Sequence, residues 1–277
     1  MHSGIKNIFY SIEIAIIRLI AFLSYILGIN KIRRKYYSLR YGPTLTVIAY
    51  HRVNDLVYDD SPDKVSTAQF ESQIKYLKDN CRVITFSEAI RIKERNVKSS
   101  DAVIITFDDG YIDNYINVVP ILNKYGLKAC FFISTDLIDC NNYKSECIAK
   151  RWKFQGMNWT DIKDLHTQGF DLGAHTCSHP NLITLPYDKA IWEIFESKNK
   201  IENVIGRPIE YFAYPYGKMN LHYDNRIKEA VASKFKICCT TNRGRNSFIS
   251  LETLDIKRIC VKNWWSIFHF ARELEGT

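Results

Sequence analysis

The hydrophobic positions of this chain follow two periods, one typical of strands and one typical of helices. Residues 102–107, Ala-Val-Ile-Ile-Thr-Phe, are apolar and mostly β-branched without alternation, which indicates a strand buried on both faces. Phe70, Ile74 and Leu77 recur at helical spacing. About seven alternating strand and helix units predict a parallel, barrel-like α/β sheet whose functional residues lie at the carboxyl ends of the strands.

The expected strands are short and rich in β-branched or aromatic residues. Residues 136–157 lack clear periodicity and are expected to form a surface insertion. The strands are predicted at residues 44–50, 82–85, 102–107, 129–134, 170–174, 211–217, 235–241 and 254–261.

The N-terminal segment Ile8 to Ile29 is almost continuously apolar. As a helix of 22 residues it would span about 33 Å, enough to cross a bilayer, but Glu13 and Arg18 make insertion marginal. Three placements stay open: a spanning helix, a helix lying at the membrane surface, and an amphipathic helix packed on the domain. No small-residue cleavage site precedes Lys31, so the segment is expected to stay on the protein.

The basic run after this segment, Lys31 to Lys35, is the only dense cluster of positive charge in the chain. Because it adjoins the apolar segment, it predicts contact with a membrane surface through residues 8–35, on the cytoplasmic face. The other basic residues are spread along the chain, so the formal charge of +8 does not predict a nucleic-acid partner. We therefore expect a membrane-associated helix with its basic flank at residues 1–40 and a globular domain at residues 41–277.

Composition adds little to this picture. The 46% hydrophobic and 25% charged residues are typical of a globular protein, and a chain of 277 residues can form one large domain. The eight cysteines form no C-x-x-C pair and no disulfide framework, so they are expected to be reduced thiols. They are Cys81, Cys130, Cys140, Cys147, Cys177, Cys238, Cys239 and Cys260.

Candidate chemistry begins where the 102–107 strand ends, at Asp108 and Asp109. Two buried carboxylates are costly unless a cation or hydrogen bonds offset them, although Asp-Asp-Gly also suits an ordinary turn. A second strand-like segment precedes His175 and His179, whose spacing of four places both imidazoles on one side of the backbone. A carboxylate with two imidazoles is typical of a catalytic metal site that keeps a position open for water.

Three motifs now stand in order along the chain: Thr106-Phe-Asp-Asp-Gly110, His175-Thr-Cys-Ser-His179 and Tyr214-Pro-Tyr-Gly217. On these residues the chain resembles the polysaccharide deacetylases of the NodB type, over roughly residues 45–261. The resemblance implies a distorted (β/α)7 barrel following the N-terminal apolar helix. It also implies metal-dependent hydrolysis of an N-acetyl group from an amino sugar, with residues 41–277 as the catalytic domain.

The resemblance also implies a role for each matching residue. Asp108 corresponds to the general base, and Asp109, His175 and His179 correspond to the ligands of one divalent metal ion, for which zinc is expected. The backbone N–H of Tyr216 corresponds to the donor that stabilises the oxyanion. The bland interpretation of Tyr216 is an ordinary core tyrosine.

Two positions depart from the family pattern. The third motif usually carries an arginine that holds the base, and here that position is Ala213, so Arg258 or Arg243 from another strand is a candidate to supply the charge. The usual C-terminal histidine motif is also missing. Instead His51 stands before the Asp-Asp strand, an order similar to that of the biofilm poly-N-acetylglucosamine deacetylases, which favours His51 over His269 as the general acid.

The leading hypothesis is a hydrolase of carbon–nitrogen bonds other than peptide bonds, a polysaccharide N-deacetylase. Its partner would be an N-acetylated amino-sugar glycan or a lipid-linked glycan precursor. One alternative keeps the metal site but acts on a non-sugar amide. Another is a catalytically silent glycan-binding protein, which Ala213 weakly favours and the intact Asp108, Asp109, His175 and His179 set disfavours.

Overall fold

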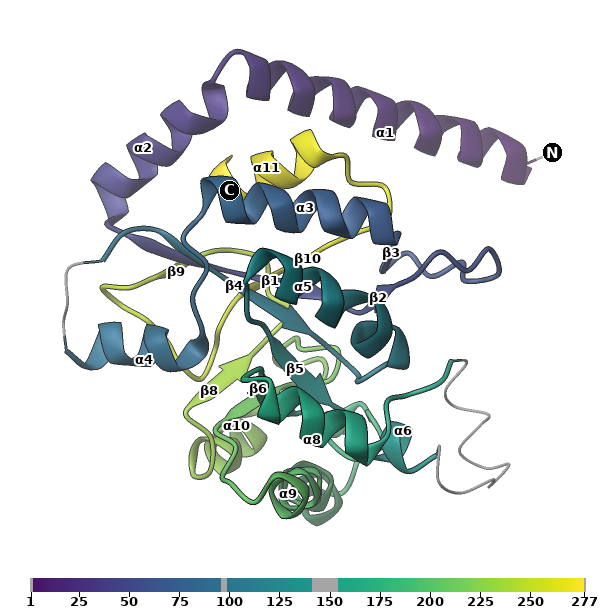
Figure 1. Cartoon of the computed structure of the whole chain (residues 1–277), viewed down its shortest axis with the longest axis vertical. Coiled ribbons are helices and arrows are strands. Elements are labelled where there is room, and N and C mark those ends of the chain that lie inside the picture. Colours follow the sequence, from purple (N-terminus) through teal and green to yellow (C-terminus); the bar gives the residue numbers. More distant parts are fainter. Residues whose placement is uncertain (1, 96–98, 141–153, 277) are drawn as a thin grey trace.

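The computed structural model describes residues 2–95, 99–140 and 154–276, so Cys147 and most of the expected 136–157 insertion lie outside the described residues. The main sheet contains eight strands, of which seven follow the order β10-β1-β4-β5-β6-β7-β8 with every neighbouring pair parallel. Figure 1 shows helices covering this sheet. These seven strands are β1 (Thr44–Tyr50), β4 (Ala102–Phe107), β5 (Cys130–Ile133), β6 (Asp171–Ala174), β7 (Tyr211–Ala213), β8 (Ile237–Cys239) and β10 (Arg258–Cys260).

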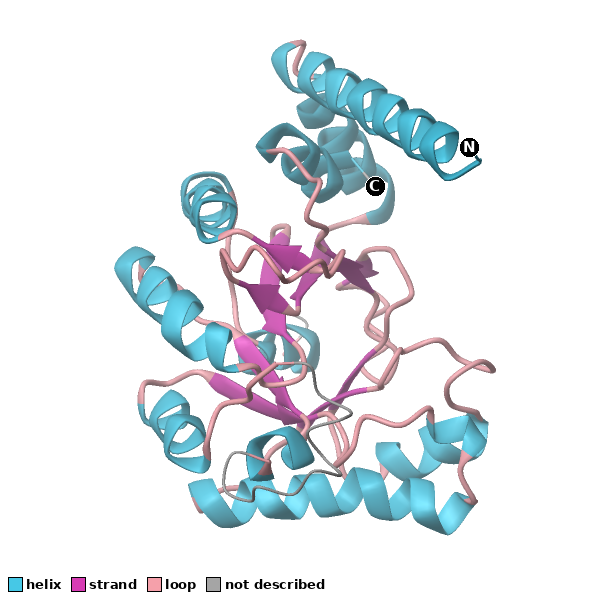
Figure 2. Ribbon diagram, turned by 90° about the vertical axis from the view of Figure 1, so that its right-hand side faces the viewer, coloured by secondary structure: helices cyan, strands magenta, loops and turns pink. Residues whose placement is uncertain are grey.

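The sheet curls around a common axis, as Figure 2 shows. Thr240 N–H donates to Ile256 O at 2.9 Å, and Arg258 N–H donates to Asn242 O at 3.0 Å. These bonds join the chain after β8 to the chain around β10. The predicted distorted seven-stranded barrel is confirmed. Short additional strands are β9 (Asn246–Ser247), antiparallel to β1, and the separate pair β2 (Arg52–Val53) and β3 (Lys64–Val65).

Strand β4 is buried on both faces, as its unbroken apolar sequence predicts. Val103, Ile105 and Phe107 belong to the core cluster that includes helix α3 (Thr67–Asn80), whereas Ala102 and Ile104 belong to a second cluster that includes helix α4 (Phe86–Glu94). The predicted strand at residues 82–85 is wrong. It is reduced to one bridge between Val83 and Val103, because Thr85 instead caps α4 by accepting from Glu88 N–H.

The surrounding helices begin at side-chain caps that the sequence supplies. Ser66 accepts from Gln69 N–H at the start of α3, and Asn158 and Asp161 form a capping box at the start of α8. The helices are α3 (Thr67–Asn80), α4 (Phe86–Glu94), α5 (Val119–Tyr125), α6 (Thr135–Asp139), α8 (Trp159–Thr167), α9 (Tyr187–Ile205) and α10 (Asn225–Ala232), with short turns η1 (Asn114–Val118) and η2 (Leu182–Thr184).

The N-terminal segment forms two helices, α1 (His2–Ile26) and α2 (Ile29–Tyr41), rather than one apolar helix reaching Ile29. The chain bends at Gly28, whose φ of 67° lies in the left-handed region that favours glycine. One face of α1 packs on the C-terminal helix α11 (Ile267–Gly276), where Phe22 and Tyr25 contact Phe268. This is the packed placement expected as one of three alternatives.

No single helix among the described residues is both long enough and apolar enough to cross a bilayer. Residues 10–26 and 29–40 satisfy that test of length and composition only as a pair, bent by 74°. The Arg18 guanidinium, one of the two charges that interrupt the apolar run, donates to Trp264 O at 3.0 and 2.7 Å. Arg18 therefore ties α1 to the segment that precedes α11.

Candidate active site

The candidate residues meet at one edge of the barrel because each follows the carboxyl end of a parallel strand. His51 follows β1, Asp108 and Asp109 follow β4, and His175 follows β6. Tyr216 lies three residues after β7. The structure thus brings together residues that lie up to 165 positions apart in the chain (51 to 216).

Asp109, His175 and His179 form a group that fits a metal ion. Their ligand atoms lie within 4.8 Å of one another, and Asp109 Oδ1 is 3.6 Å from His175 Nε2 and 3.5 Å from His179 Nε2. Asp109 Oδ1 is buried and makes no hydrogen bond within the described part of the chain. A buried carboxylate oxygen facing two imidazole nitrogens suits a divalent cation, since a cation satisfies all three groups at once.

His175 is oriented by the residue at which the expected arginine is missing. Its Nδ1 lies 2.6 Å from Ala213 O, which leaves Nε2 directed at Asp109. Burial lowers the pKa of His175 to about 4, against the opposing charge of Asp108. The imidazole is therefore neutral at pH 7 and retains the lone pair that a metal ligand needs.

The loop between the two histidines is held by Glu193 of α9, a residue that sequence reasoning missed. The Glu193 carboxylate accepts from both the N–H and the hydroxyl of Ser178 at 2.9 Å, and its carbonyl accepts from Cys177 N–H at 3.1 Å. Glu193 is only 4% exposed. Its place beside Ile194 on the buried face of an amphipathic helix is the signal that could have found it.

The site is built on backbone that side chains rarely adopt. Asp109, Thr176, His179 and Tyr216 all have φ between 53° and 75°, and they are four of the five described non-glycine residues with positive φ. Each such residue costs on the order of 1 kcal/mol or more, so surrounding contacts must hold it in place. Among these contacts, Ser134 N–H donates to Asp109 O, and His179 N–H donates to Thr176 Oγ1.

Arg258 supplies the charge that is missing at Ala213. Its Nη1 and Nη2 atoms donate to the two carboxylate oxygens of Asp108, both at 2.7 Å, and its Nε donates to Thr240 O. Arg243, the other candidate, instead forms an ion pair with Glu273. Arg258 begins β10, which pairs with β1, and β1 pairs in turn with β4, so the Arg258 side chain reaches Asp108 across one intervening strand.

The surroundings of the two adjacent carboxylates shift their pKa values in opposite directions. Burial raises the pKa of Asp108, but the charge and hydrogen bonds of Arg258, together with His175 and His51, outweigh burial and hold that pKa well below its usual range. Burial raises the pKa of Asp109, a shift that nearby His51 and His175 oppose. Asp108 is therefore an ionised carboxylate in an ion pair, while Asp109 faces the imidazoles.

Of the two candidate acid histidines, His51 is the one beside the carboxylates. Its charge lowers the pKa of both Asp108 and Asp109, and its Nδ1 is buried without a hydrogen-bond partner among the described residues. His269 lies on α11 between two tryptophan rings, with Nε2 3.4 Å from Glu273. His269 thus contacts Trp264, Trp265 and Glu273 rather than Asp108 or Asp109.

Tyr216 presents both its ring and its backbone at the mouth of the site. The ring is 49% exposed, and its centroid lies 4.8 Å from that of His179. Thr241 Oγ1 donates to Tyr216 O at 2.5 Å, which fixes this peptide. The Tyr216 N–H has no acceptor among residues 2–95, 99–140 and 154–276, so it is available as a donor.

Comparison with known proteins agrees with this geometry. A family model described as polysaccharide deacetylase matches residues 95–234, about half of the chain, and includes the Asp108 and His175 motifs. The chain belongs to the polysaccharide deacetylase family. Its sequence is 28% identical over 205 residues to YxkH of Bacillus subtilis, covering 73% of this chain and 66% of that protein.

This polysaccharide deacetylase family member is also 30% identical over 187 residues to a poly-beta-1,6-N-acetyl-D-glucosamine N-deacetylase of Staphylococcus aureus. That match covers 62% of this chain and 64% of the relative. The chain thus spans just under two thirds of the length of both curated relatives. In structure it is similar to the Streptococcus pyogenes deacetylase PplD in complex with acetate, with a TM-score of 0.72, 23% identity and coverage of 84% and 98%.

The ion pair of Asp108 and Arg258 can be measured as a contribution to stability. In this member of the family, Arg258→Met leaves a buried carboxylate without its partner, so we expect a loss of about 3–5 kcal/mol in the free energy of unfolding. Adding Asp108→Asn should recover a large part of that loss. Urea denaturation of the two single variants and the double variant measures the coupling.

The control is Arg82→Met, which removes a half-exposed ion pair with Glu88 and should cost less than about 1 kcal/mol. Equal losses in the Arg258 and Arg82 variants would contradict a buried, energetically coupled pair.

Metal binding tests the Asp109 group without any assay of activity. The purified chain should retain about one divalent metal ion after dialysis, and a chelator should lower its melting temperature, because a bound ion would stabilise only the folded state. Asp109→Asn and His179→Gln should lose the metal, whereas His269→Gln should keep it. Metal analysis by mass spectrometry provides the readout. Retention of the metal by the Asp109 and His179 variants would show that the ion binds elsewhere.

Proposed function

We propose that this chain removes N-acetyl groups from an N-acetylated amino-sugar glycan. The observation that carries the proposal is the ionised Asp108 carboxylate, held by Arg258 next to the metal-fitting group of Asp109, His175 and His179. Membership of the polysaccharide deacetylase family supports the reaction. The name of the Staphylococcus aureus relative supports an N-acetylglucosamine polymer as the substrate class.

In this proposal Asp109, His175 and His179 hold one divalent ion, for which zinc is the best fit to two imidazoles and a carboxylate. When bound, the ion would polarise the acetyl carbonyl and make water a stronger nucleophile. The chain's own residues then move the protons. Asp108 is not needed as a ligand of the ion, and each of its oxygens keeps a second lone pair beside the bond from Arg258, so its carboxylate can accept a proton from the attacking water.

Two further groups complete the reaction. The Tyr216 N–H donates a hydrogen bond to the acetyl oxygen as negative charge develops on it, which lowers the energy of the tetrahedral state. His51 gives a proton to the nitrogen of the sugar as the amide bond breaks, so that the amine leaves as a neutral group. Arg258 acts as a positioning residue because it holds both oxygens of Asp108 in one orientation.

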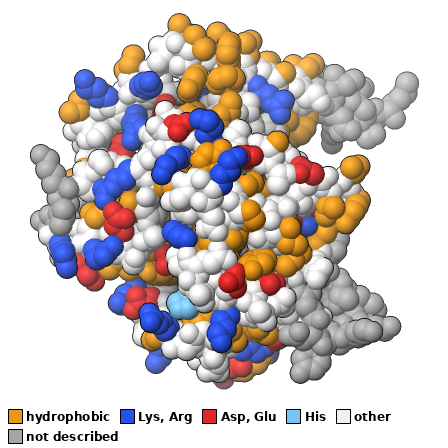
Figure 3. All heavy atoms as spheres, in the orientation of Figure 1, with side chains coloured by type: hydrophobic (Ala, Val, Ile, Leu, Met, Phe, Trp, Pro, Cys, Tyr) orange, Lys and Arg blue, Asp and Glu red, His pale blue; other side chains and the backbone are white. Residues whose placement is uncertain are grey.

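The proposal also includes a membrane. The outward face of α1 carries a stripe of large apolar side chains that are 45–63% exposed, and the opposite face of the helix packs on α11. Figure 3 shows hydrophobic side chains along the edge formed by α1, with lysines and arginines beside them over α2. The stripe consists of Ile12, Ile16, Leu19, Ile20, Leu23 and Ile26.

This arrangement suits a helix lying in the plane of the membrane rather than across it, because its inner face already packs on protein. The basic residues of α2, among them Lys31 and Lys35, would face anionic headgroups, which is the basis for proposing the cytoplasmic leaflet.

The deacetylation proposal is tested by acetate release from N-acetylglucosamine oligomers. Asp108→Asn and His51→Gln should each lower kcat by about 100-fold or more, since each removes a proton-transfer group. His269→Gln and His222→Gln are matched controls and should stay within a few-fold of the parent. Circular dichroism checks that each variant is folded.

Unchanged acetate release by Asp108→Asn would show that Asp108 is not the general base. Turnover of a cyclic imide without turnover of the oligomers would instead favour a non-sugar amide. Metal binding with no turnover of either would favour a glycan-binding protein.

The membrane proposal is tested by sedimentation with vesicles that contain phosphatidylglycerol. The full chain should bind, and the double variant Ile16→Asp/Leu23→Asp should bind at least tenfold more weakly. The reason is that burying the apolar surface of each of these side chains in the bilayer contributes about 1.5 kcal/mol to the free energy of binding. Ile249→Asp, which changes an exposed isoleucine outside α1 and α2, is the control. Equal binding by all three proteins would show that α1 does not contact the membrane.

A further inference from the structure

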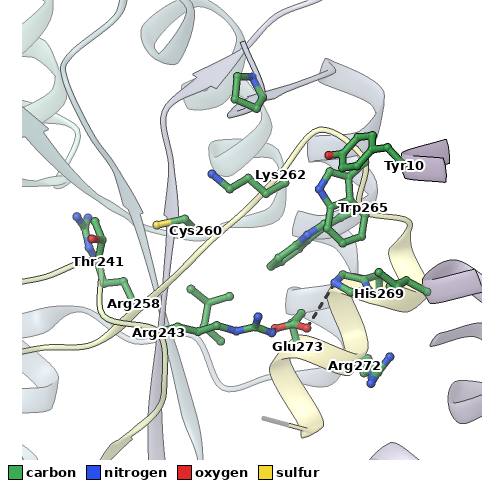
Figure 4. Close-up of a pocket in the computed structure, with 14 residues that line it drawn as sticks. Tyr10, Thr241, Arg243, Arg258, Cys260, Lys262, Trp265, His269, Arg272 and Glu273 are labelled. Atoms are coloured by element: carbon green, nitrogen blue, oxygen red, sulfur yellow. Dashed lines mark hydrogen bonds and ion pairs between the residues drawn. The ribbon is translucent and has the colours of Figure 1, made fainter. Parts of the chain in front are cut away.

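A cavity lies between α1, α11 and the segment that follows β10. Its volume of about 650 Å³ is in the usual range for small-molecule sites. Figure 4 shows Tyr10 beside Trp265 on one side of the cavity and Arg243 directed at Glu273 on the other. Helix α1 contributes Tyr10 and Ile17 to the wall. Family membership does not account for this cavity, because the matched residues 95–234 include none of these residues from α1 and α11.

The cavity adjoins the candidate active site through two residues. Arg258 lines the cavity and binds both oxygens of Asp108. Thr241 lines it as well and donates to the carbonyl of Tyr216. A ligand in the cavity would therefore lie next to a substrate whose acetyl group reaches Asp108.

The cavity carries more positive than negative charge. Arg243, Lys262 and Arg272 line it, and Glu273 is the only acid in its wall among the described residues. Glu273 is already shared between Arg243 and His269, and Lys262 pairs with Asp63 outside the cavity. No acidic partner of Arg272 exists within the described part of the chain. At least one guanidinium is thus left for an anionic ligand.

The state of His269 agrees with a positive potential. Burial, together with the charges of Arg272, Arg243 and Arg18, lowers the pKa of His269 to about 4. His269 is therefore neutral at pH 7, and the positive charge of the wall resides on its arginines and on Lys262.

The position of the cavity relates it to the membrane-facing stripe. Ile17 lines the cavity from the inner face of α1, while Ile16 and Ile20 on the outer face are exposed. Two tryptophans, Trp264 and Trp265, line the same space, and tryptophan is enriched where proteins meet the headgroup layer. When α1 lies on a bilayer, the cavity is separated from the lipid by the thickness of one helix.

We propose that this cavity binds the phosphate of a lipid-phosphate-linked amino-sugar glycan, with the glycan extending from it into the site at Asp108. The proposal rests on the proposed deacetylation and names its substrate class. A phosphate is the fitting ligand because it accepts hydrogen bonds from arginine and lysine together and carries the charge that Arg272 lacks a partner for. The same phosphate chemistry is present in phospholipid headgroups, so the experiment separates the two sources.

The experiment compares kcat/KM for acetate release from three forms of one N-acetylglucosamine tetramer. The first is unmodified, the second carries a reducing-end phosphate, and the third carries a reducing-end polyprenyl phosphate in phosphatidylcholine vesicles. We expect the phosphate to raise kcat/KM about tenfold, through KM, and the lipid to raise it further. Arg272→Gln should abolish the gain from phosphate and leave turnover of the unmodified tetramer within twofold.

Arg226→Gln on α10, remote from the cavity wall, is the matched control and should keep the full gain. Equal kcat/KM for the unmodified and phosphorylated tetramers would overturn the cavity proposal while leaving deacetylation intact. If phosphatidylglycerol vesicles give the unmodified tetramer the same gain, the headgroup is the ligand and the substrate assignment is wrong.

Failure of all three substrates to release acetate would count against the proposed function, and binding then decides the cavity proposal. The phosphorylated tetramer should quench tryptophan fluorescence at lower concentration than the unmodified one in the parent chain. It should lose that advantage in Arg272→Gln. Equal binding of the two tetramers would overturn the cavity proposal without reference to turnover.

Discussion

The buried ion pair between Asp108 and Arg258 is the interaction on which the site depends. A carboxylate that is 2% exposed at the end of a core strand is tolerable only with a charged partner of good geometry, and the two parallel bonds of a guanidinium provide it. Because Arg258 also binds Thr240 O, the pair ties the two closing ends of the barrel to β4. The charge that prepares the site for chemistry is thus part of what closes the sheet.

The rest of the site combines strained backbone at the functional residues with buried contacts that hold this backbone in place. Asp109, His179 and Tyr216 adopt positive φ, which places their functional groups at the mouth but costs free energy. The Ala213 carbonyl fixes the ring of His175, and the buried Glu193 fixes the loop that leads to His179. Support of this kind explains how three candidate ligands from separate loops can converge on one point.

The N-terminal helices extend the same site toward a surface. Arg18 is tied to the Trp264 carbonyl, so α1 and the wall of the cationic cavity form one unit. An apolar stripe, a cavity with unbalanced positive charge and a metal-fitting group then lie in succession from the outer edge to the barrel. This order agrees with a substrate that is held by a lipid phosphate at one end and cleaved at the other.

The sequence alone determined the barrel and the identity of the acid and imidazole groups, because period and motif order are local properties. It also placed His51 ahead of His269. Tertiary structure decided what no local pattern encodes: that Arg258 rather than Arg243 reaches Asp108, that Glu193 turns inward, and that the apolar N-terminal run breaks and packs one face on α11. Each of these depends on which strand ends and helix faces meet, and that is set only when the sheet closes.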